Sequence, residues 1–400
     1  MKFNLILISF AIVSNINAIS LQQIKQSTLQ NNKNLEIYDT KINISKKNEN
    51  LDLKWNNIVL GFGVNDILIN DITSRDKEAM QTQYITASQI IPISQKKENK
   101  NKISKIQTSI YALLKKDKNI RLNSKILENL NNYKIIKQKI KILKKLQSNI
   151  KEIKTLQNQR YKTTSLAQID IVTNDSEYLN IRLKIQTLEN KLKIIKLNIQ
   201  NIAYIPINKI QYELSKYKLD KVNITKLLSQ NNMYKVLEKK VLKNKQKIEL
   251  EESKKIADIK LNIGYYQRES FDDYVGFSIN YPLSIYGRED IKINQAKQEV
   301  LQSQIQIKEF ENDFTTNILT ILEKQKISYT NYGFIKEQII PKKEYILKLL
   351  ISNSRNTSIN TLEQLKIKNK ILNDNLRAND VLLEFYNTKA KLAYFKGVSL

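Results

Sequence analysis

The few helix-breaking residues of this chain constrain its fold more than any other feature. Its 400 residues include only seven glycines and four prolines. Residues 93–205 contain neither type, which leaves room for two very long helices in succession. Four of the glycines fall in two short segments of alternating polarity, and Pro92 and Pro282 each follow one of those segments. We therefore expect a chain that is built twice from a strand pair, a proline, a long helix and a returning helix.

The strand segments have one apolar face. Apolar and small or polar residues alternate over 58–65, and a second extended run covers 83–91. The second half repeats this over 259–266 and 274–281, with tyrosines at the ends. This pattern is typical of a lipid-facing barrel strand beside an aromatic girdle, and it fits a half-buried soluble hairpin equally well. In the first case the lipid-facing residues of the last strand are Val275, Phe277 and Ile279.

The helical stretches carry apolar residues at coiled-coil spacing. The seam positions of the first helix are Ile103, Ile106, Ile110, Leu113, Ile136, Ile140, Leu143, Ile150 and Ile153. About 65 residues rising 1.5 Å each predict a rod of roughly 100 Å. Polar breaks at 161–165 and 352–360 predict chain reversals, and Pro341 predicts a kink or an interruption in the second long helix.

The first eighteen residues have the pattern of a secretory signal. Lys2 precedes an apolar run over 5–13, and Ala18 is a plausible cleavage end. Ile16 fits poorly at the third position before that cut, so the sequence does not fix the exact cleavage site. No later segment contains eighteen uncharged apolar residues. We expect an exported chain that meets a membrane through strands or through a surface.

Composition excludes several classes of function. The formal charge is 67 − 39 = +28, but the lysines are spread along the whole chain and form no basic run interleaved with aromatic residues. Lysines on solvated helix faces therefore explain the charge better than binding to nucleic acid. Cysteine and histidine are absent, so we expect no transition-metal site and no cofactor. The acid pairs Asp272-Asp273 and Glu289-Asp290 have no His or Cys to work with, and we expect no catalytic residues and no enzyme activity.

One stretch carries a family resemblance. Residues 276–288 read GFSINYPLSIYGR, which combines a strand end, Pro-Leu, Gly-Arg and a helix start, and residues 87–97 are the counterpart in the first half. Ile339-Ile-Pro341, the break at 352–360 and the ending LAYFKG at 392–397 follow in the expected order. With these features duplicated at matching spacings, the chain resembles the TolC-type outer-membrane efflux proteins over essentially its whole mature length.

The resemblance implies a mainly α protein with a β-barrel part. A homotrimer would form a 12-stranded barrel in the outer-membrane lipid, with four strands from each chain, and the barrel would continue into a coiled-coil tube in the periplasm. A periplasmic adaptor and an inner-membrane transporter would be its partners. The implied divisions are a signal peptide (1–18), a first repeat (19–205; strands about 56–70 and 82–91, helical hairpin about 93–205) and a second repeat (206–400; strands about 257–267 and 274–282, helical hairpin about 288–397). Pro92, Pro282 and Gly287 would make the strand-to-helix turns.

The resemblance also implies a periplasmic aperture near the helix reversals. Glu363 stands at the position of a family aperture acid, Lys366 stands where one member has a second acid, and Asp170 follows the first reversal. As the alternative, both acids are ordinary exposed helix carboxylates. The reversal loops carry Thr164 and Asn356-Thr357 where the family often has glycine, which bears on loop geometry and on the choice of partner.

The expected function is an exit duct for an efflux or secretion system. An exported structural coiled-coil protein of the periplasm or cell surface is the alternative, although it would need neither the duplicated strand pairs nor their prolines. The sequence leaves open the cargo (drug, metal ion or protein), the class of inner-membrane partner and whether the gate is open or closed.

Overall fold

The computed structural model describes residues 18–160, 165–352 and 358–399, which form two compact units. The first unit contains the described residues of 1–36, 117–231 and 314–400, and the second contains 37–116 and 232–313. Three helices, α2 (Lys33–Asp52), α3 (Lys96–Arg160) and α7 (Arg288–Phe334), contribute residues to both units. Each sequence repeat therefore supplies part of each unit.

The second unit is organised around a four-stranded sheet. Its order is β2-β3-β5-β6, and every neighbouring pair is antiparallel. The strands are β2 (Val59–Asn65), β3 (Thr82–Ile91), β5 (Ile259–Gln267) and β6 (Tyr274–Asn280). The strand pair from each half of the chain thus enters one sheet, whose open edges are β2 and β6.

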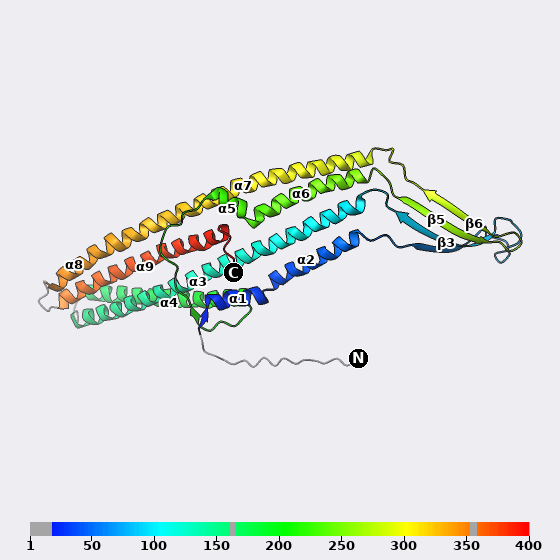
Figure 1. The fold of residues 1–400 in the computed structure, drawn as a ribbon. Helices are drawn as coiled ribbons and strands as arrows, with labels where there is room; N and C mark the ends of the chain where they lie inside the picture. The colour runs from blue at the N-terminus through cyan, green and yellow to red at the C-terminus, as the bar shows by residue number, and fades with distance from the viewer. Residues whose placement is uncertain (1–17, 161–164, 353–357, 400) are drawn as a thin grey trace. The chain divides into compact units, whose positions relative to one another are not determined.

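All four helical connections leave the sheet at the same end (Figure 1). In an antiparallel hairpin the first strand begins at the same end of the sheet where the second strand finishes. The helices before and after each hairpin therefore lie at the same end of the sheet. These helices are α2 (Lys33–Asp52), α3, α6 (Asn232–Ser253) and α7. The loops 66–81 and 268–273 lie at the opposite end.

The first strand is shorter than in the division of repeats implied by the resemblance. We expected it over about 56–70, but the strand ends at Asn65. Asp66 has a φ of 54°, in the left-handed region that a strand cannot continue through. Aspartate adopts this conformation more readily than β-branched residues do, which is why the strand can end here without glycine.

The first unit is helical. Besides its parts of α2, α3 and α7 it contains α1 (Leu21–Asn31), α4 (Ser165–Ala203), α5 (Ile224–Gln230), α8 (Ile340–Ser352) and α9 (Ser358–Phe395). Two-residue strands, β1 (Ile19–Ser20) and β4 (Ile210–Gln211), pair in parallel. Ser20 also caps α1 through a reciprocal pair of hydrogen bonds with Gln23. The segment 19–23 is therefore held both by the β1–β4 pairing and by the helix cap.

The core of this unit follows the predicted seam of α3. The seam residues from its second half are buried: Ile136, Ile140, Leu143, Ile150 and Ile153. From α4, Ile181, Ile185 and Ile195 are buried in the same cluster as most of them. Leu179, Leu183 and Leu197 of α4 are exposed instead. Thus α4 has two apolar stripes, and the fold of one chain covers only one of them.

The predicted interruption at Pro341 is confirmed. A π-helical turn, η1 (Ile335–Ile339), separates α7 from α8, and the amide of Ile340 donates to the carbonyl of Ile335. Proline has no N–H with which to continue the i→i−4 pattern, and the wider turn directly before it accommodates this loss.

An ionic cluster ties the irregular segment after β4 to the helices. The Asp220 carboxylate accepts from Lys396 at 2.5 Å and from Gln325 at 2.8 Å. Burial disfavours the charge on Asp220, but these hydrogen bonds and the nearby Lys389 outweigh burial and lower its pKa. Close by in sequence, Tyr217 stacks on Tyr329 with ring centroids 4.7 Å apart.

Candidate functional site

The sheet has an exposed apolar face. Cross-strand registers place Phe62 beside Ile85, Ile85 beside Tyr265, and Ile263 beside Phe277. Phe62 is 70% exposed and Phe277 65% exposed, although both lie within regular strands. In β6, Val275 and Ile279 share this face with Phe277 and are also exposed. A continuous apolar surface across a sheet is costly in water, and such a surface marks contact with lipid or protein.

The opposite face is polar. Ser88, Asn262 and Ser278 form one row across three strands, and Asn262 donates to Ser278 at 3.0 Å. Because side chains alternate between the two faces of a strand, a shift of the register by one residue would exchange them. The sheet thus has one apolar and one polar face, as a sheet that separates lipid from water requires.

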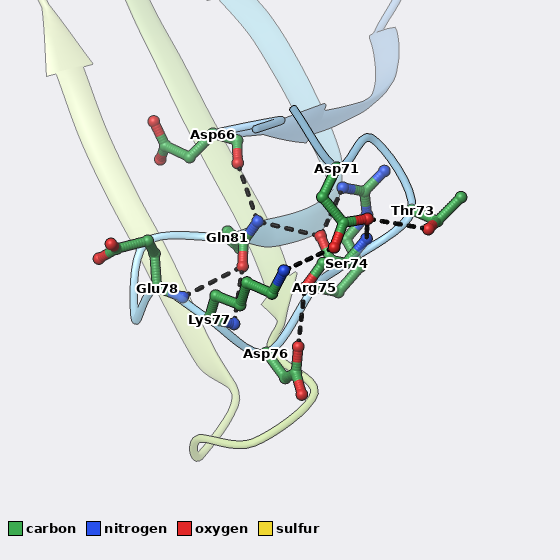
Figure 2. A network of polar contacts seen from close by, with 9 residues as sticks. All are labelled: Asp66, Asp71, Thr73, Ser74, Arg75, Asp76, Lys77, Glu78 and Gln81. Atoms are coloured by element: carbon green, nitrogen blue, oxygen red, sulfur yellow. Dashed lines mark hydrogen bonds and ion pairs between the residues drawn. The ribbon is translucent and has the colours of Figure 1, made fainter. Parts of the chain in front are cut away.

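The loop between β2 and β3 is held by two polar side chains (Figure 2). Gln81 is 1% exposed; it accepts from the amides of Lys77 and Glu78 and donates to the carbonyls of Asp66 and Ser74. This arrangement satisfies both ends of its amide and closes the loop on itself.

Asp71 is the second anchor of this loop. Its carboxylate accepts from Lys77 at 2.6 Å, from Thr73 and from the amide of Ser74. The hydrogen bond from Lys77 is the main cause that lowers the pKa of Asp71. The loop therefore has a defined shape at the end of the sheet away from the helices.

Each predicted turn residue lies between a strand and a helix. Pro92 directly follows β3 and precedes α3 by four residues, and Pro282 stands two residues after β6. Gly287 directly precedes α7 with a φ of 67°, a conformation that a residue with a side chain rarely adopts. Its carbonyl accepts from the amide of Ile291 in the first turn of α7. Gly287 thus sets the direction in which that helix begins.

Of the predicted aperture residues, Glu363 and Lys366 lie together on α9. Their side chains form an ion pair at 2.8 Å, and each is about half exposed. On the same helix Leu362 and Leu365 are buried against Ile153 of α3. The packing of these leucines fixes how α9 is rotated, and it leaves the charged pair at the surface.

Asp170 lies exposed in the second turn of α4. Its backbone carbonyl accepts from Asn174, which also donates to Gln157 of α3 at 2.5 Å. Lys154 and Asp175 form a second link between the two helices, at 2.5 Å. No interaction joins Asp170 to Glu363 among the described residues. Thr164, Asn356 and Thr357 lie outside them.

Two kinds of feature are absent from the described residues. No helix within 18–160, 165–352 or 358–399 is long and apolar enough to cross a membrane. Over the same ranges no group of three or more His, Cys, Asp or Glu side chains is placed to hold a metal ion.

Comparison with solved structures identifies the fold. No family model and no curated protein sequence matches the chain. The chain is similar to the CmeC outer-membrane channel of Campylobacter jejuni (TM-score 0.74, 11% identity, 94% of this chain and 86% of that chain). It is also similar to the open state of the MtrE outer-membrane channel of Neisseria gonorrhoeae (TM-score 0.70, 10% identity, 94% and 89%). A third match is the outer-membrane protein VceC of Vibrio cholerae (TM-score 0.67, 12% identity, 92% and 95%).

This chain has the TolC-type fold. The TolC-type fold explains the duplication of the strand pair and the long helices, and it confirms the fold class predicted from the sequence. At 10–12% identity the shared fold is carried by the pattern of buried and exposed positions and hardly by particular residues.

One feature of this sheet was not predicted from the sequence. Tyr84, Tyr266 and Tyr274 come from three strands and lie in one row on the polar face. The strand alternation does place each of these tyrosines on the face opposite to the apolar residues, so the sequence indicates which face they share. The cross-strand register that aligns them depends on pairing between the two halves of the chain, which strand patterns alone do not specify.

Proposed function

We propose that the chain is one subunit of a homotrimeric exit duct in the outer membrane. The observation that carries this proposal is the four-stranded sheet with an exposed apolar face and open edges at β2 and β6. A sheet with open edges is not tolerated in lipid, because its unpaired backbone groups find no water there. Three copies give 3 × 4 = 12 strands, and pairing β6 of each copy with β2 of the next would close a barrel.

The two faces of the sheet support a barrel that contains water. In this arrangement Phe62, Ile263 and Phe277 face lipid, whereas Asn262 and Ser278 face the lumen. The loops 66–81 and 268–273 would then lie outside the cell, and the helices that leave the other end of the sheet would extend into the periplasm.

The second apolar stripe of α4 supports assembly through the helices as well. Leu179, Leu183 and Leu197 are exposed in one chain, and Ile169, Val172 and Ile194 of the same helix are exposed too. Apolar side chains at helical spacing on an already packed helix are suited to a second helix partner, as at a coiled-coil seam. Neighbouring subunits would supply that partner.

An inner-membrane transporter and a periplasmic adaptor complete the proposed system. The duct itself would hold no energy source, so transport through it follows the pump. The solved channels named above are outer-membrane proteins, and their shared fold supports this role without selecting among drug, metal-ion and protein cargo. An exported coiled-coil protein with a structural role is the competing hypothesis, but it does not account for the exposed apolar sheet face.

Recording in planar lipid bilayers tests the proposal. Purified protein in detergent, added to one side, should produce discrete conductance steps, and protein unfolded before addition serves as the control. A structural coiled-coil protein would give no steps at any concentration. The absence of steps from protein that remains folded would therefore favour that alternative.

A further inference from the structure

The polar face of the sheet changes abruptly in side-chain size from one cross-strand row to the next. One row contains Gly61, Thr86, Gly264 and Gly276, all small. The adjacent row, closer to the loops, contains Gly63, Tyr84, Tyr266 and Tyr274. Three bulky side chains therefore gather at one level, directly beside a level with almost none.

The three tyrosines contact one another across the strands. The rings of Tyr266 and Tyr274 stack with centroids 4.8 Å apart and planes 5° from parallel. The Tyr84 ring lies 5.7 Å from that of Tyr266. The Arg268 guanidinium lies 5.3 Å from the centroid of the Tyr274 ring. Stacking and cation–π contact both hold the rings in place, so the row is ordered.

Glycines give these rings the space they occupy. A Cβ atom on Gly264 would lie 2.8 Å from Cε2 of Tyr266, and one on Gly63 would overlap the Tyr84 hydroxyl. The Tyr266 ring therefore leans along its own strand over Gly264, and the Tyr84 ring leans across to Gly63 on the neighbouring strand. Aromatic side chains that cover glycines across a sheet stabilise strand pairing, which gives the row a structural reason to persist.

We infer that this tyrosine row is a size filter at the outer end of the barrel. The inference rests on the proposed trimer, in which the polar face lines the lumen. Three subunits then place 3 × 3 = 9 tyrosines at one level, followed on the helix side by a level of glycines and threonines. Because pore-lining side-chain volume sets the local diameter, this collar of Tyr84, Tyr266 and Tyr274 limits the size of molecules that pass between the lumen and the outside.

The absence of cysteine from the chain allows a direct test. Ser278→Cys places a thiol on the lumen face, on the helix side of the collar. Met80→Cys places one in the β2–β3 loop outside the collar, where Met80 is 74% exposed. Intact cells carrying either reporter are treated with membrane-impermeant maleimides of increasing size, and the labelling rates are compared.

The collar predicts a size-dependent result. Small maleimides should label both reporters, and bulky ones should label the loop reporter much faster than the lumen reporter. In a Tyr84→Ala/Tyr266→Ala/Tyr274→Ala background, lumen labelling by bulky maleimides should rise several-fold, while small-reagent and loop labelling stay unchanged. The corresponding triple Phe variant keeps the ring volume and should retain the original cut-off.

Two further outcomes distinguish failure of the size filter from failure of the proposed duct. Unchanged bulky-reagent labelling in the Ala variant, with small reagents still entering, would overturn the filter and leave the duct intact. A lumen reporter that no small reagent labels would contradict the assignment of the polar face to the lumen. If the triple Ala variant does not assemble, Gly63→Ala tests the same idea, since its methyl group should displace the Tyr84 ring into the lumen and slow bulky labelling.

Discussion

At the scale of single residues, the candidate aperture is a balanced pair of charges. The ion pair of Glu363 and Lys366 makes this exposed turn of α9 locally neutral. Exposed pairs of this kind contribute only about 0–1 kcal/mol to stability, so either side chain can be neutralised without unfolding the helix. A role in the aperture would therefore appear in ion selectivity.

Neutralising Glu363 and neutralising Lys366 should change the cation selectivity of the channel in opposite directions. If the pair lines a narrow mouth, Glu363→Gln leaves Lys366 uncompensated in each subunit and should lower the cation selectivity of single channels. Lys366→Gln leaves the acid uncompensated and should raise selectivity and strengthen block by polyvalent cations. Asp170→Asn should shift selectivity in the same direction as Glu363→Gln. Reversal potentials in a salt gradient measure all three, and unchanged values throughout would reduce these residues to solvated helix charges.

At the scale of elements, the register of the sheet separates its apolar face from its polar face. Phe277 and Ser278 are neighbours in β6 whose side chains point to opposite faces. Phe277 pairs with Ile263, and Ser278 pairs with Asn262. The two positions therefore form a matched pair for the same substitution.

Lysine at these two positions should have unequal effects. In the lipid layer, Phe277→Lys should cost about 2–4 kcal/mol near the bilayer midplane and impair assembly. Ser278→Lys faces water in the lumen and should assemble nearly as well as the original protein. The amount of trimer in the outer-membrane fraction is the measurement, and equal losses from both variants would contradict the register.

Much of the element order could be predicted from local pattern. The alternation around Phe277 and the helical spacing from Ile136 to Ile153 each depend only on neighbours in sequence, and they predict the strands and the buried seam. The β1–β4 pair could not be predicted, because two-residue strands carry no periodicity. The exposure of Leu183 could not be predicted either, since a leucine facing a second subunit has the same spacing as one facing its own core.

Some residues of the candidate sites could likewise be predicted from local sequence, and others could not. Gly287 could be predicted as a turn residue because its position between a strand and a helix favours the left-handed backbone that glycine adopts. The pairing of Lys366 with Glu363 follows from their i,i+3 spacing on a helix. The tyrosine row required the register between β3 and β5, which joins residues about 180 positions apart, and sequence pattern holds no information at that range.

At the scale of the whole molecule, the proposed duct requires trimer formation in the outer membrane. A single chain leaves β2 and β6 as open edges and exposes an apolar sheet face and a second stripe on α4. In the proposed trimer, pairing of β6 with β2 of the next copy would close the open edges and turn the apolar face to lipid, and a neighbouring subunit would cover the second stripe of α4.

Native mass measurement on the detergent-extracted outer-membrane fraction tests this claim most directly. We expect the protein to be recovered from that fraction, to require detergent to remain in solution and to have the mass of three chains. A detergent-independent monomer released with the periplasmic contents would contradict it.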